Sequence, residues 1–223
     1  MSIFVYTDGL CQPVNPGGIA TYGWVAYKDS KKIQEECACV CSGPEATNNV
    51  AEYSGIIAAL RWLLANGYSG EKIIVCSDSQ FCVRQLNGQY AVKSTRVMPL
   101  YLQVKELARK FKDLSFEWIH REKNQEADSL SRKAYDNYVL STVQENIRRQ
   151  KAKKLAVGVQ NISKNRYRVE SQSTPGLFYV VDLEKMSCAC PDFATRGKLR
   201  PCKHILAVRM FVAGKVDRIA ASR

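Results

Sequence analysis

Four acidic residues occupy positions from which their carboxylates could act together. Asp8 and Asp78 each directly follow a run of β-forming residues, so both are expected to emerge from the ends of sheet strands. Glu52 lies four residues before Ile56, which places its carboxylate on the apolar stripe of a predicted helix, and Asp128 falls early in another helix. If the sheet and helices pack conventionally, these acids converge on one spot.

Such a cluster could bind divalent cations. Close carboxylates repel one another and raise each other's pKa unless cations neutralise them. Mg²⁺ prefers a few carboxylates together with water and phosphate oxygens. Two such ions, roughly 3.5 to 4 Å apart, would activate a water molecule and stabilise the departing 3′ oxygen of a phosphodiester. Taken singly, each acid also has a structural interpretation. Asp8 and Asp78 could stabilise turns, and the other two could stabilise helix N-termini.

A second group of residues near the C-terminus has the spacing of a metal site. Cys188-x-Cys190 and Cys202-x-His204, separated by eleven residues, offer three thiolates and one imidazole. This set suits one structural Zn²⁺ in a closed tetrahedral site. Because four protein ligands leave no open position, the zinc would contribute folding free energy and no chemistry. The alternative is a group of thiols buried in a core.

Most of the other cysteines are interpreted as packing residues. Cys37, Cys39 and Cys41 alternate and are expected to share one face of a strand, with no fourth ligand nearby, while Cys76 and Cys82 are assigned to the core. Nine cysteines in a chain without a signal-like N-terminus indicate reduced thiols or metal ligands. We therefore expect an intracellular protein, cytoplasmic by default with the nucleus as the alternative, and no secretion or membrane segment.

The elements that would position the carboxylates follow an α/β pattern. Runs of β-forming residues predict five strands, at 3–7, 22–27, 37–41, 72–76 and 115–119. Apolar residues at helical spacing predict helices over 49–66, 100–111 and 124–139. Consecutive strands followed by alternating helices and strands indicate a five-stranded mixed sheet flanked by helices.

The C-terminal third is organised differently. Residues 143–154 form a charged helical stretch with little apolar periodicity, which indicates a connector. Strand-like segments, the Cys/His set and a helix from about 204 to 212 follow, as in a small α+β module. We therefore divide the 223 residues into a domain at 1–140, a basic helical connector at 141–155 and a zinc-stabilised module at 156–223.

Positive charge is concentrated in this last part of the chain. The net charge of +12 favours a polyanionic partner. Residues 1–140 hold 16 Lys and Arg against 15 Asp and Glu, a balance of +1, whereas residues 141–223 hold 17 against 6, a balance of +11. The C-terminal third is therefore the stronger candidate for binding nucleic acid.

Several motifs around the four acids resemble ribonuclease HI in order and spacing. They are Tyr6-Thr-Asp8-Gly, Thr47-Asn-Asn-Val-Ala-Glu52, Ser77-Asp78-Ser-Gln80 and Glu117-Trp118-Ile119, followed by Asn124-Gln-Glu-Ala-Asp128. The resemblance covers about residues 1–138. It implies a ribonuclease H-like fold, with Asp8, Glu52, Asp78 and Asp128 as ligands of two Mg²⁺ or Mn²⁺ ions. It also implies hydrolysis of the RNA strand of RNA/DNA hybrids.

The resemblance extends to candidate substrate-binding residues. By matching position, the side chains expected to contact the RNA strand are Cys11, Asn15, Asn48 and Gln80. Thr47 matches a residue that holds a DNA phosphate in the family. Both Thr47 and Asn49 lie at a helix start, where free backbone N–H groups favour a phosphate. The alternative for each is capping or turn stabilisation.

The chain departs from many ribonucleases HI in two places. Residues 87–112 are too short and too weakly basic to form the Lys-rich protrusion that grips the hybrid, so the first domain alone is expected to bind weakly. The family's loop histidine, thought to assist proton transfer or product release, has no counterpart in register. His120 is the candidate catalytic residue there, with Arg121 as its substitute and a structural or substrate-contact role as the alternative.

The Cys/His set and its surroundings resemble a SWIM zinc finger over about residues 156–212. The matching segments are Tyr167-Arg-Val169, Phe178-Tyr-Val-Val181, Cys188-Ala-Cys-Pro-Asp-Phe193 and Pro201-Cys-Lys-His-Ile-Leu-Ala207. Such modules are associated with binding nucleic acid or protein, and the charge balance favours nucleic acid. We expect a monomer that binds RNA/DNA hybrid and has no membrane partner. The competing hypotheses are a catalytically silent hybrid-binding protein and a SWIM module that recruits a protein.

Overall fold

The computed structural model of the chain describes residues 2–196 and 200–220, so the end of the expected module, at 221–223, lies outside the described residues. Its internal contacts divide the chain into two compact units, Met1–Val139 and Leu140–Arg223, which are described separately below. Among the described residues, no helix is both long enough and apolar enough to cross a membrane.

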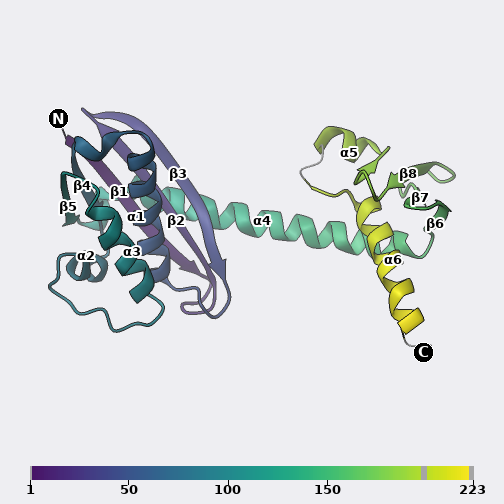
Figure 1. Ribbon diagram of the computed structural model, residues 1–223, viewed down its shortest axis with the longest axis horizontal. Coiled ribbons are helices and arrows are strands. Elements are labelled where there is room, and N and C mark those ends of the chain that lie inside the picture. The colour runs from purple at the N-terminus through teal and green to yellow at the C-terminus, as the bar shows by residue number, and fades with distance from the viewer. Residues whose placement is uncertain (1, 197–199, 221–223) are drawn as a thin grey trace. The chain divides into compact units, whose positions relative to one another are not determined.

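The first unit is built on a five-stranded mixed sheet (Figure 1). Its strands are β1 (Ser2–Gln12), β2 (Ile19–Lys28), β3 (Lys31–Ser42), β4 (Lys72–Ser77) and β5 (Asp113–Trp118), in the order β3-β2-β1-β4-β5. The first three strands are antiparallel to one another, while β4 runs parallel to β1 and β5 parallel to β4. The predicted mixed sheet is confirmed, and β1 through β3 extend well beyond the predicted runs.

Helices pack on both faces of this sheet (Figure 1). One face carries α1 (Asn48–Ala65), α2 (Gln80–Leu86) and α3 (Met98–Ala108), and the short helices η1 (Tyr68–Gly70) and η2 (Arg121–Lys123) lie in connections. The predicted helix at 124–139 and the charged stretch at 143–154 form one continuous helix, α4 (Gln125–Ala156). The sequence analysis missed α2, because seven residues are too few to show a helical period.

Alternation along β1 explains how the core forms. Ile3 and Val5 are fully buried on one face and pack with Trp24 of β2 and with Ile56 and Leu60 of α1. Residues at alternate positions of a strand point to opposite faces, so Asp8 lies on the face away from this core. Asp8 is therefore positioned by the same periodicity that buries Ile3 and Val5.

A β-bulge changes the expected placement of the strand cysteines. The register between β2 and β3 shifts between Ala20 and Thr21, so Cys41 pairs with Ala20 while Cys39 pairs with Thr21. Cys41 packs in a small cluster with Cys11 and Ala20, whereas the Thr21 hydroxyl bonds to the Ser131 carbonyl of α4. The prediction that Cys37, Cys39 and Cys41 share one face is therefore wrong, because the extra residue at the bulge reverses the alternation.

The second unit contains its own sheet and core. Strands β6 (Gln160–Ser163), β7 (Arg166–Glu170), β8 (Phe178–Asp182) and β9 (Ser187–Cys188) form an antiparallel sheet in sequence order, followed by α5 (Pro191–Arg196) and α6 (Lys203–Ala220). Its core combines aliphatic residues such as Val169, Val181 and Ile205 with three cysteines of the predicted zinc set. This is the small α+β module that the sequence pattern predicts.

The start of α4 packs directly on the backbone of β2 at Gly23. A Cβ atom at this position would lie 2.5 Å from both Leu130 Cβ and Ser131 N. We predict that Gly23→Ala lowers the free energy of unfolding of the first unit by about 1–3 kcal/mol, because the helix would have to move outward. Gly70→Ala is the matched control, since its Cβ would meet no atom within 4 Å. Equal stability of the two variants in urea unfolding would contradict this packing.

Candidate functional site

Three of the four predicted acids meet at one place in the first unit. One carboxylate oxygen from each of Asp8, Glu52 and Asp78 lies within 4.8 Å of the others. Asp8 comes from the middle of β1, Glu52 from the first turn and a half of α1, and Asp78 from the residue after β4. The prediction that Asp8 follows a strand is wrong in detail, because β1 continues to Gln12.

Glu52 reaches the sheet because α1 lies unusually close to β1. A Cβ atom on Gly9 would lie only 2.3 Å from Glu52 N, so only glycine permits this contact. The Ser77 hydroxyl donates to Glu52 Oε2 at 3.4 Å. The side chain is thus buried between two strands and its own helix, at 7% exposure.

Burial and mutual repulsion perturb these carboxyl groups. Burial raises the pKa of Glu52 well above its usual value, and the neighbouring Asp8 and Asp78 raise it further. Burial likewise raises the pKa of Asp8 to about 6, opposed by a hydrogen bond from Ser131. Groups of this kind ionise readily only beside a positive charge. The oxygen-rich cluster therefore fits a hard divalent cation.

Asp128 lies beside this group but is held differently. Arg132 donates to its carboxylate from Nε at 2.7 Å, and Arg121 donates from an Nη atom at 2.8 Å. Hydrogen bonds from Arg132 and Arg121 lower the pKa of Asp128 below its usual value. The carboxylate interacts electrostatically with Asp8. Asp128 is therefore a neighbour of the three-acid group, with its charge already matched by two arginines.

Two polar residues that the sequence analysis did not assign to the site organise it. The Asn124 side-chain amide donates to both Thr7 O and Asp78 Oδ1, each at 2.9 Å, and the Ser131 hydroxyl donates to Asp8 Oδ2 at 2.5 Å. Asn124 stands at the start of a predicted helix, so its position in the sequence is typical of an N-terminal helix cap. Ser131 follows Asp128 by three residues and therefore lies on the same face of the helix, which is the feature of the sequence that could have assigned it to the site.

The predicted substrate-contact residues occupy the end of β1, the β1–β2 loop and the starts of α1 and α2. Thr47 caps α1 by accepting from Val50 N at 3.1 Å, and Asn15 Oδ1 accepts from Asn48 N at 3.2 Å. Asn49 and Gln80 lie in the first turns of α1 and α2. The Cys11 thiol is buried and donates to Val14 O. Thr47 therefore has the capping role that its sequence position allowed.

His120 lies outside the acidic group. Its ring packs against Trp118 at a centroid distance of 4.6 Å, and the Trp118 indole donates to the Asp78 carbonyl oxygen at 3.1 Å. Arg121, by contrast, contacts Asp128 directly. Arg121 is thus in contact with one of the four predicted acids, whereas His120 is linked to Asp78 only through Trp118.

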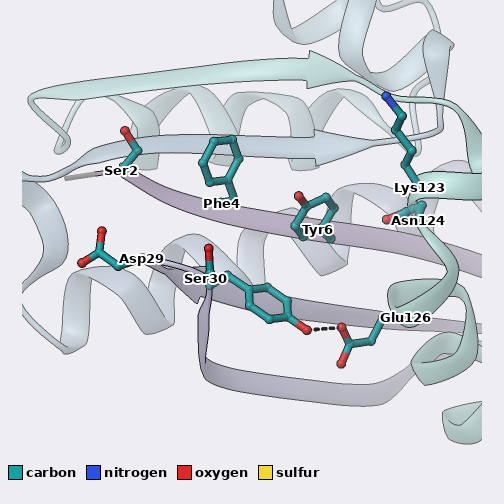
Figure 2. A pocket seen from close by; sticks show the side chains of 9 residues that line it. Ser2, Phe4, Tyr6, Asp29, Ser30, Lys123, Asn124 and Glu126 are labelled. Atoms are coloured by element: carbon teal, nitrogen blue, oxygen red, sulfur yellow. Dashed lines mark hydrogen bonds between the residues drawn. The ribbon is translucent and has the colours of Figure 1, made fainter.

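A cavity of about 710 Å³ lies on the sheet face away from α1 (Figure 2). Phe4, Tyr6 and Tyr27 supply its apolar walls, and the Tyr27 hydroxyl donates to Glu126. Its lining includes Asn124 but none of the acids Asp8, Glu52 and Asp78. The acidic group is therefore a separate site, and Asn124 both lines this cavity and donates to Asp78.

All four predicted zinc ligands meet in the second unit. Ligand atoms of Cys188, Cys190, Cys202 and His204 lie within 4.8 Å of one another, and all four residues are buried. His204 Nδ1 faces the sulfurs, 3.9 Å from Cys188 and 4.0 Å from Cys202. Tetrahedral zinc ligands are separated by roughly 3.6 Å at ordinary bond lengths, so the cluster fits Zn²⁺ after a small contraction.

The protonation of this cluster also suits a cation. The Cys188 thiol donates to the Cys202 sulfur, which lowers the pKa of Cys202 and raises that of Cys188. His204 Nε2 is buried without a hydrogen-bond partner among the described residues. A metal bonded at Nδ1 would fix the imidazole in the tautomer that carries its proton on Nε2.

Comparison with known proteins finds a matching family for each unit. Residues 7–134 match the family described as reverse transcriptase-like, and residues 179–208 match the SWIM zinc finger. The bifunctional protein Rv2228c of Mycobacterium tuberculosis is 34% identical over 61% of this chain and 36% of its own length. Its solved N-terminal RNase H domain superposes with a TM-score of 0.57 at 34% identity, covering 63% of this chain and 98% of that domain.

Two further relatives extend the comparison. Ribonuclease HI of Halobacterium salinarum is 32% identical over 60% of this chain and 65% of that protein. The structure of LC11-RNase H1, isolated from compost, in complex with an RNA/DNA hybrid has a TM-score of 0.57 at 33% identity, covering 61% of this chain and 99% of that one.

The matches cover only part of each relative but more than half of this chain. The chain spans only about a third of the length of the mycobacterial relatives and under two thirds of the halobacterial one. The family match nevertheless covers more than half of the 223 residues, including Asp8, Glu52, Asp78 and Asp128. This chain therefore belongs to the reverse transcriptase-like family, has the ribonuclease H fold in its first unit, and carries a SWIM zinc finger in its second.

Proposed function

We propose that this chain is a metal-dependent endoribonuclease that hydrolyses the RNA strand of RNA/DNA hybrids. The observation that carries the proposal is the convergence of Asp8, Glu52 and Asp78 from three separate places in the chain into one group, in which Asp8 and Glu52 are buried and Asp78 is half-buried. The resemblance of the surrounding fold to ribonucleases H, including LC11-RNase H1 solved with a hybrid, supports the same substrate.

Asp8, Glu52, Asp78 and Asp128 would together hold two Mg²⁺ or Mn²⁺ ions. Such ions, when bound, supply an activated water molecule and stabilise the departing 3′ oxygen of the phosphodiester. Ser131 and Asn124 orient Asp8 and Asp78 by donating hydrogen bonds from neutral groups. Because these donors carry no charge, the two carboxylates keep their negative charge for the cations.

Residues around the first turns of α1 and α2 would place the hybrid over the acids. Asn48 and Asn15 lie side by side, and Gln80 follows Asp78 by two residues, so all three can reach RNA 2′-hydroxyls near the scissile bond. The N-terminus of α1, with Thr47 and Asn49, would hold a DNA phosphate. Cys11 would contribute through its backbone, since its thiol bonds to Val14 O.

Arg121 is better placed than His120 to assist product release, because its permanent positive charge can hold a phosphate. It already contacts Asp128, and its exposed guanidinium can leave this carboxylate when a phosphate or a cation arrives. His120 would support the site indirectly by packing on Trp118. Of the two residues predicted for this role, Arg121 is therefore preferred over His120.

The second unit would act as a zinc-stabilised handle for nucleic acid. Cys188, Cys190, Cys202 and His204 would hold one Zn²⁺. The handle compensates for the missing Lys-rich protrusion, because residues 141–223 carry a balance of +11 against +1 for the rest. We propose a monomeric intracellular protein with domains at 1–140 and 156–223, in which residues 141–155 are the C-terminal part of α4.

Replacement of one acid tests the catalytic proposal. We expect Asp78→Asn or Asp8→Asn to lose more than nine tenths of the cleavage of a labelled RNA/DNA hybrid in Mg²⁺, because an amide does not supply the charge that holds the cation. Wild-type cleavage should also occur in Mn²⁺ and stop in EDTA. Asp113→Asn is the control, since Asp113 is exposed at the start of β5. A wild-type protein that binds the hybrid without cutting it would instead support the catalytically silent alternative.

The buried carboxyl groups should make the metal-free first unit less stable as pH rises. The pKa of Asp8 is raised from 3.8 to about 6 by burial, so protonation favours the folded state. This stabilisation is present below the unfolded-state pKa and is lost as pH rises through about 6, a change of roughly 2–3 kcal/mol in all, of which about 1.4 kcal/mol falls between about pH 5 and about pH 7.5. Mg²⁺ should remove most of the loss, and Asp8→Asn should reduce it.

Tryptophan fluorescence isolates this effect from the zinc module. All three tryptophans, Trp24, Trp62 and Trp118, lie in the first unit. Urea unfolding followed by their emission, at about pH 5 and about pH 7.5, therefore reports only this unit. A metal-free protein with equal stability at both pH values would contradict the buried-carboxylate account.

Zinc binding has an equally direct test. Protein purified without chelator should contain about one zinc per chain, and Cys202→Ser should lose it and unfold only the second unit. Far-ultraviolet circular dichroism should then fall while the tryptophan-monitored unfolding curve stays unchanged. Cys37→Ser is the control because Cys37 lies on β3, outside the cluster. Full folding of the metal-free protein by both probes would rule out a structural zinc.

A further inference from the structure

The second unit contains a basic cavity that neither metal site uses. Its volume is about 380 Å³, and it is lined by Gln144, Ile147, Arg148 and Lys151 of α4, Asp192 of α5 and Lys203 of α6. Three cations therefore line one cavity: Arg148 and Lys151 come from α4, and Lys203 comes from α6, which is far from α4 in sequence. Such an arrangement concentrates positive potential in a partly enclosed space.

Arg148 is the most confined of these cations. Its side chain is only 8% exposed, and its Nη1 atom donates to Glu145 at 2.9 Å. A guanidinium carries five N–H donors in a planar fork, so Arg148 can bind Glu145 and an anion at the same time. Partial burial also strengthens any charged hydrogen bond that it makes.

One glutamine links the Lys203 side chain to the backbone of α4 at Lys151. Lys203 Nζ donates to the Gln172 side-chain oxygen at 3.1 Å, and the Gln172 amide donates to Lys151 O at 3.4 Å. Lys203 is the first residue of α6, whose N-terminal end carries partial positive charge. It also lies between Cys202 and His204, so the metal cluster fixes its backbone.

The charges select an anionic occupant. The cations Arg148, Lys151 and Lys203 outnumber the acids Asp192 and Glu145 at this place. A phosphodiester matches the guanidinium fork and carries one negative charge per nucleotide. Ile147 provides an apolar wall on which the adjoining sugar can pack.

We propose that this cavity binds one backbone phosphate of the nucleic acid that the chain acts on. The inference rests on the proposed function in that the strand belongs to the hybrid substrate or to the duplex that flanks it. Part of the excess positive charge of residues 141–223 would therefore act at one defined site, in which Arg148, Lys151 and Lys203 bind a single phosphate. If the lysines instead made separate phosphate contacts spread over the surface, each substitution would lower the salt dependence of binding independently of the other.

Salt dependence of binding distinguishes these two cases. Full-length protein with zinc and without added Mg²⁺ is titrated into a fluorescently labelled RNA/DNA hybrid at several salt concentrations, and anisotropy gives Kd. Lys151→Gln and Lys203→Gln should each raise Kd about tenfold at low salt. Because both lysines hold the same phosphate together with Arg148, the double variant should lower the log–log salt slope by no more than about 0.9 in total, and not by the roughly 1.8 expected for two separate contacts.

Two controls keep the test specific. Lys154→Gln removes an equally exposed lysine from the same helix outside the cavity and should change Kd less than twofold. Arg148→Lys keeps the charge but removes the fork, and should weaken binding with zinc content unchanged. Unaltered Kd and slope in the cavity variants would overturn the proposal, as would an equal effect of Lys154→Gln.

The outcomes also separate this inference from the proposed nuclease function. If the hybrid is not cleaved but the cavity variants lose binding as described, the nuclease proposal fails and the phosphate site stands. If cleavage depends on Asp78 but the cavity variants bind normally, the phosphate site alone fails. A polyglutamate peptide that displaces the hybrid from wild-type protein at equal charge concentration would overturn the assignment to phosphate and point to an acidic protein partner.

Discussion

The first unit depends on bringing mutually repelling carboxylates together in a buried place. Asp8, Glu52 and Asp78 approach within 4.8 Å, and burial raises the pKa of both Asp8 and Glu52. Their closest side-chain donors are the neutral groups of Ser131, Asn124 and Ser77. The fold therefore orients the acids without neutralising them, and the repulsion that remains is what a divalent cation would relieve.

This arrangement requires two unusually close backbone contacts. Gly9 lets α1 approach β1 so that Glu52 reaches the acid group, and Gly23 lets α4 approach β2 so that Ser131 reaches Asp8. The contacts lie on opposite faces of the sheet: the one at Gly9 brings α1 to the core face, and the one at Gly23 brings α4 to the face on which Asp8 lies. The hydrophobic core beneath, with Ile56 and Leu60, supplies the stability that offsets the repulsion.

The second unit is a small domain with little apolar surface to bury, so its stability needs another source. Its core includes Cys188, Cys190 and Cys202, so the same residues that pack the interior also form the metal cluster. The cluster in turn fixes Lys203 at the start of α6, beside the basic cavity. The residues of the metal cluster and a residue of the proposed phosphate site therefore occupy adjacent positions of one segment.

The sequence by itself determined the fold class, the mixed sheet and the SWIM finger, and it predicted three acids and four Cys/His residues that the structure brings together. Periodicity and spacing are local properties, so the stripe that carries Glu52 and the pair Cys202-x-His204 are legible without coordinates. Only the tertiary structure decided which residues surround them. The bulge that turns Cys41 away from Cys39, the links from Asn124 to Asp78 and from Ser131 to Asp8, and the pairing of Asp128 with arginines all join elements or depend on side-chain packing. Such contacts depend on how closely two backbones approach, and no local pattern encodes that distance.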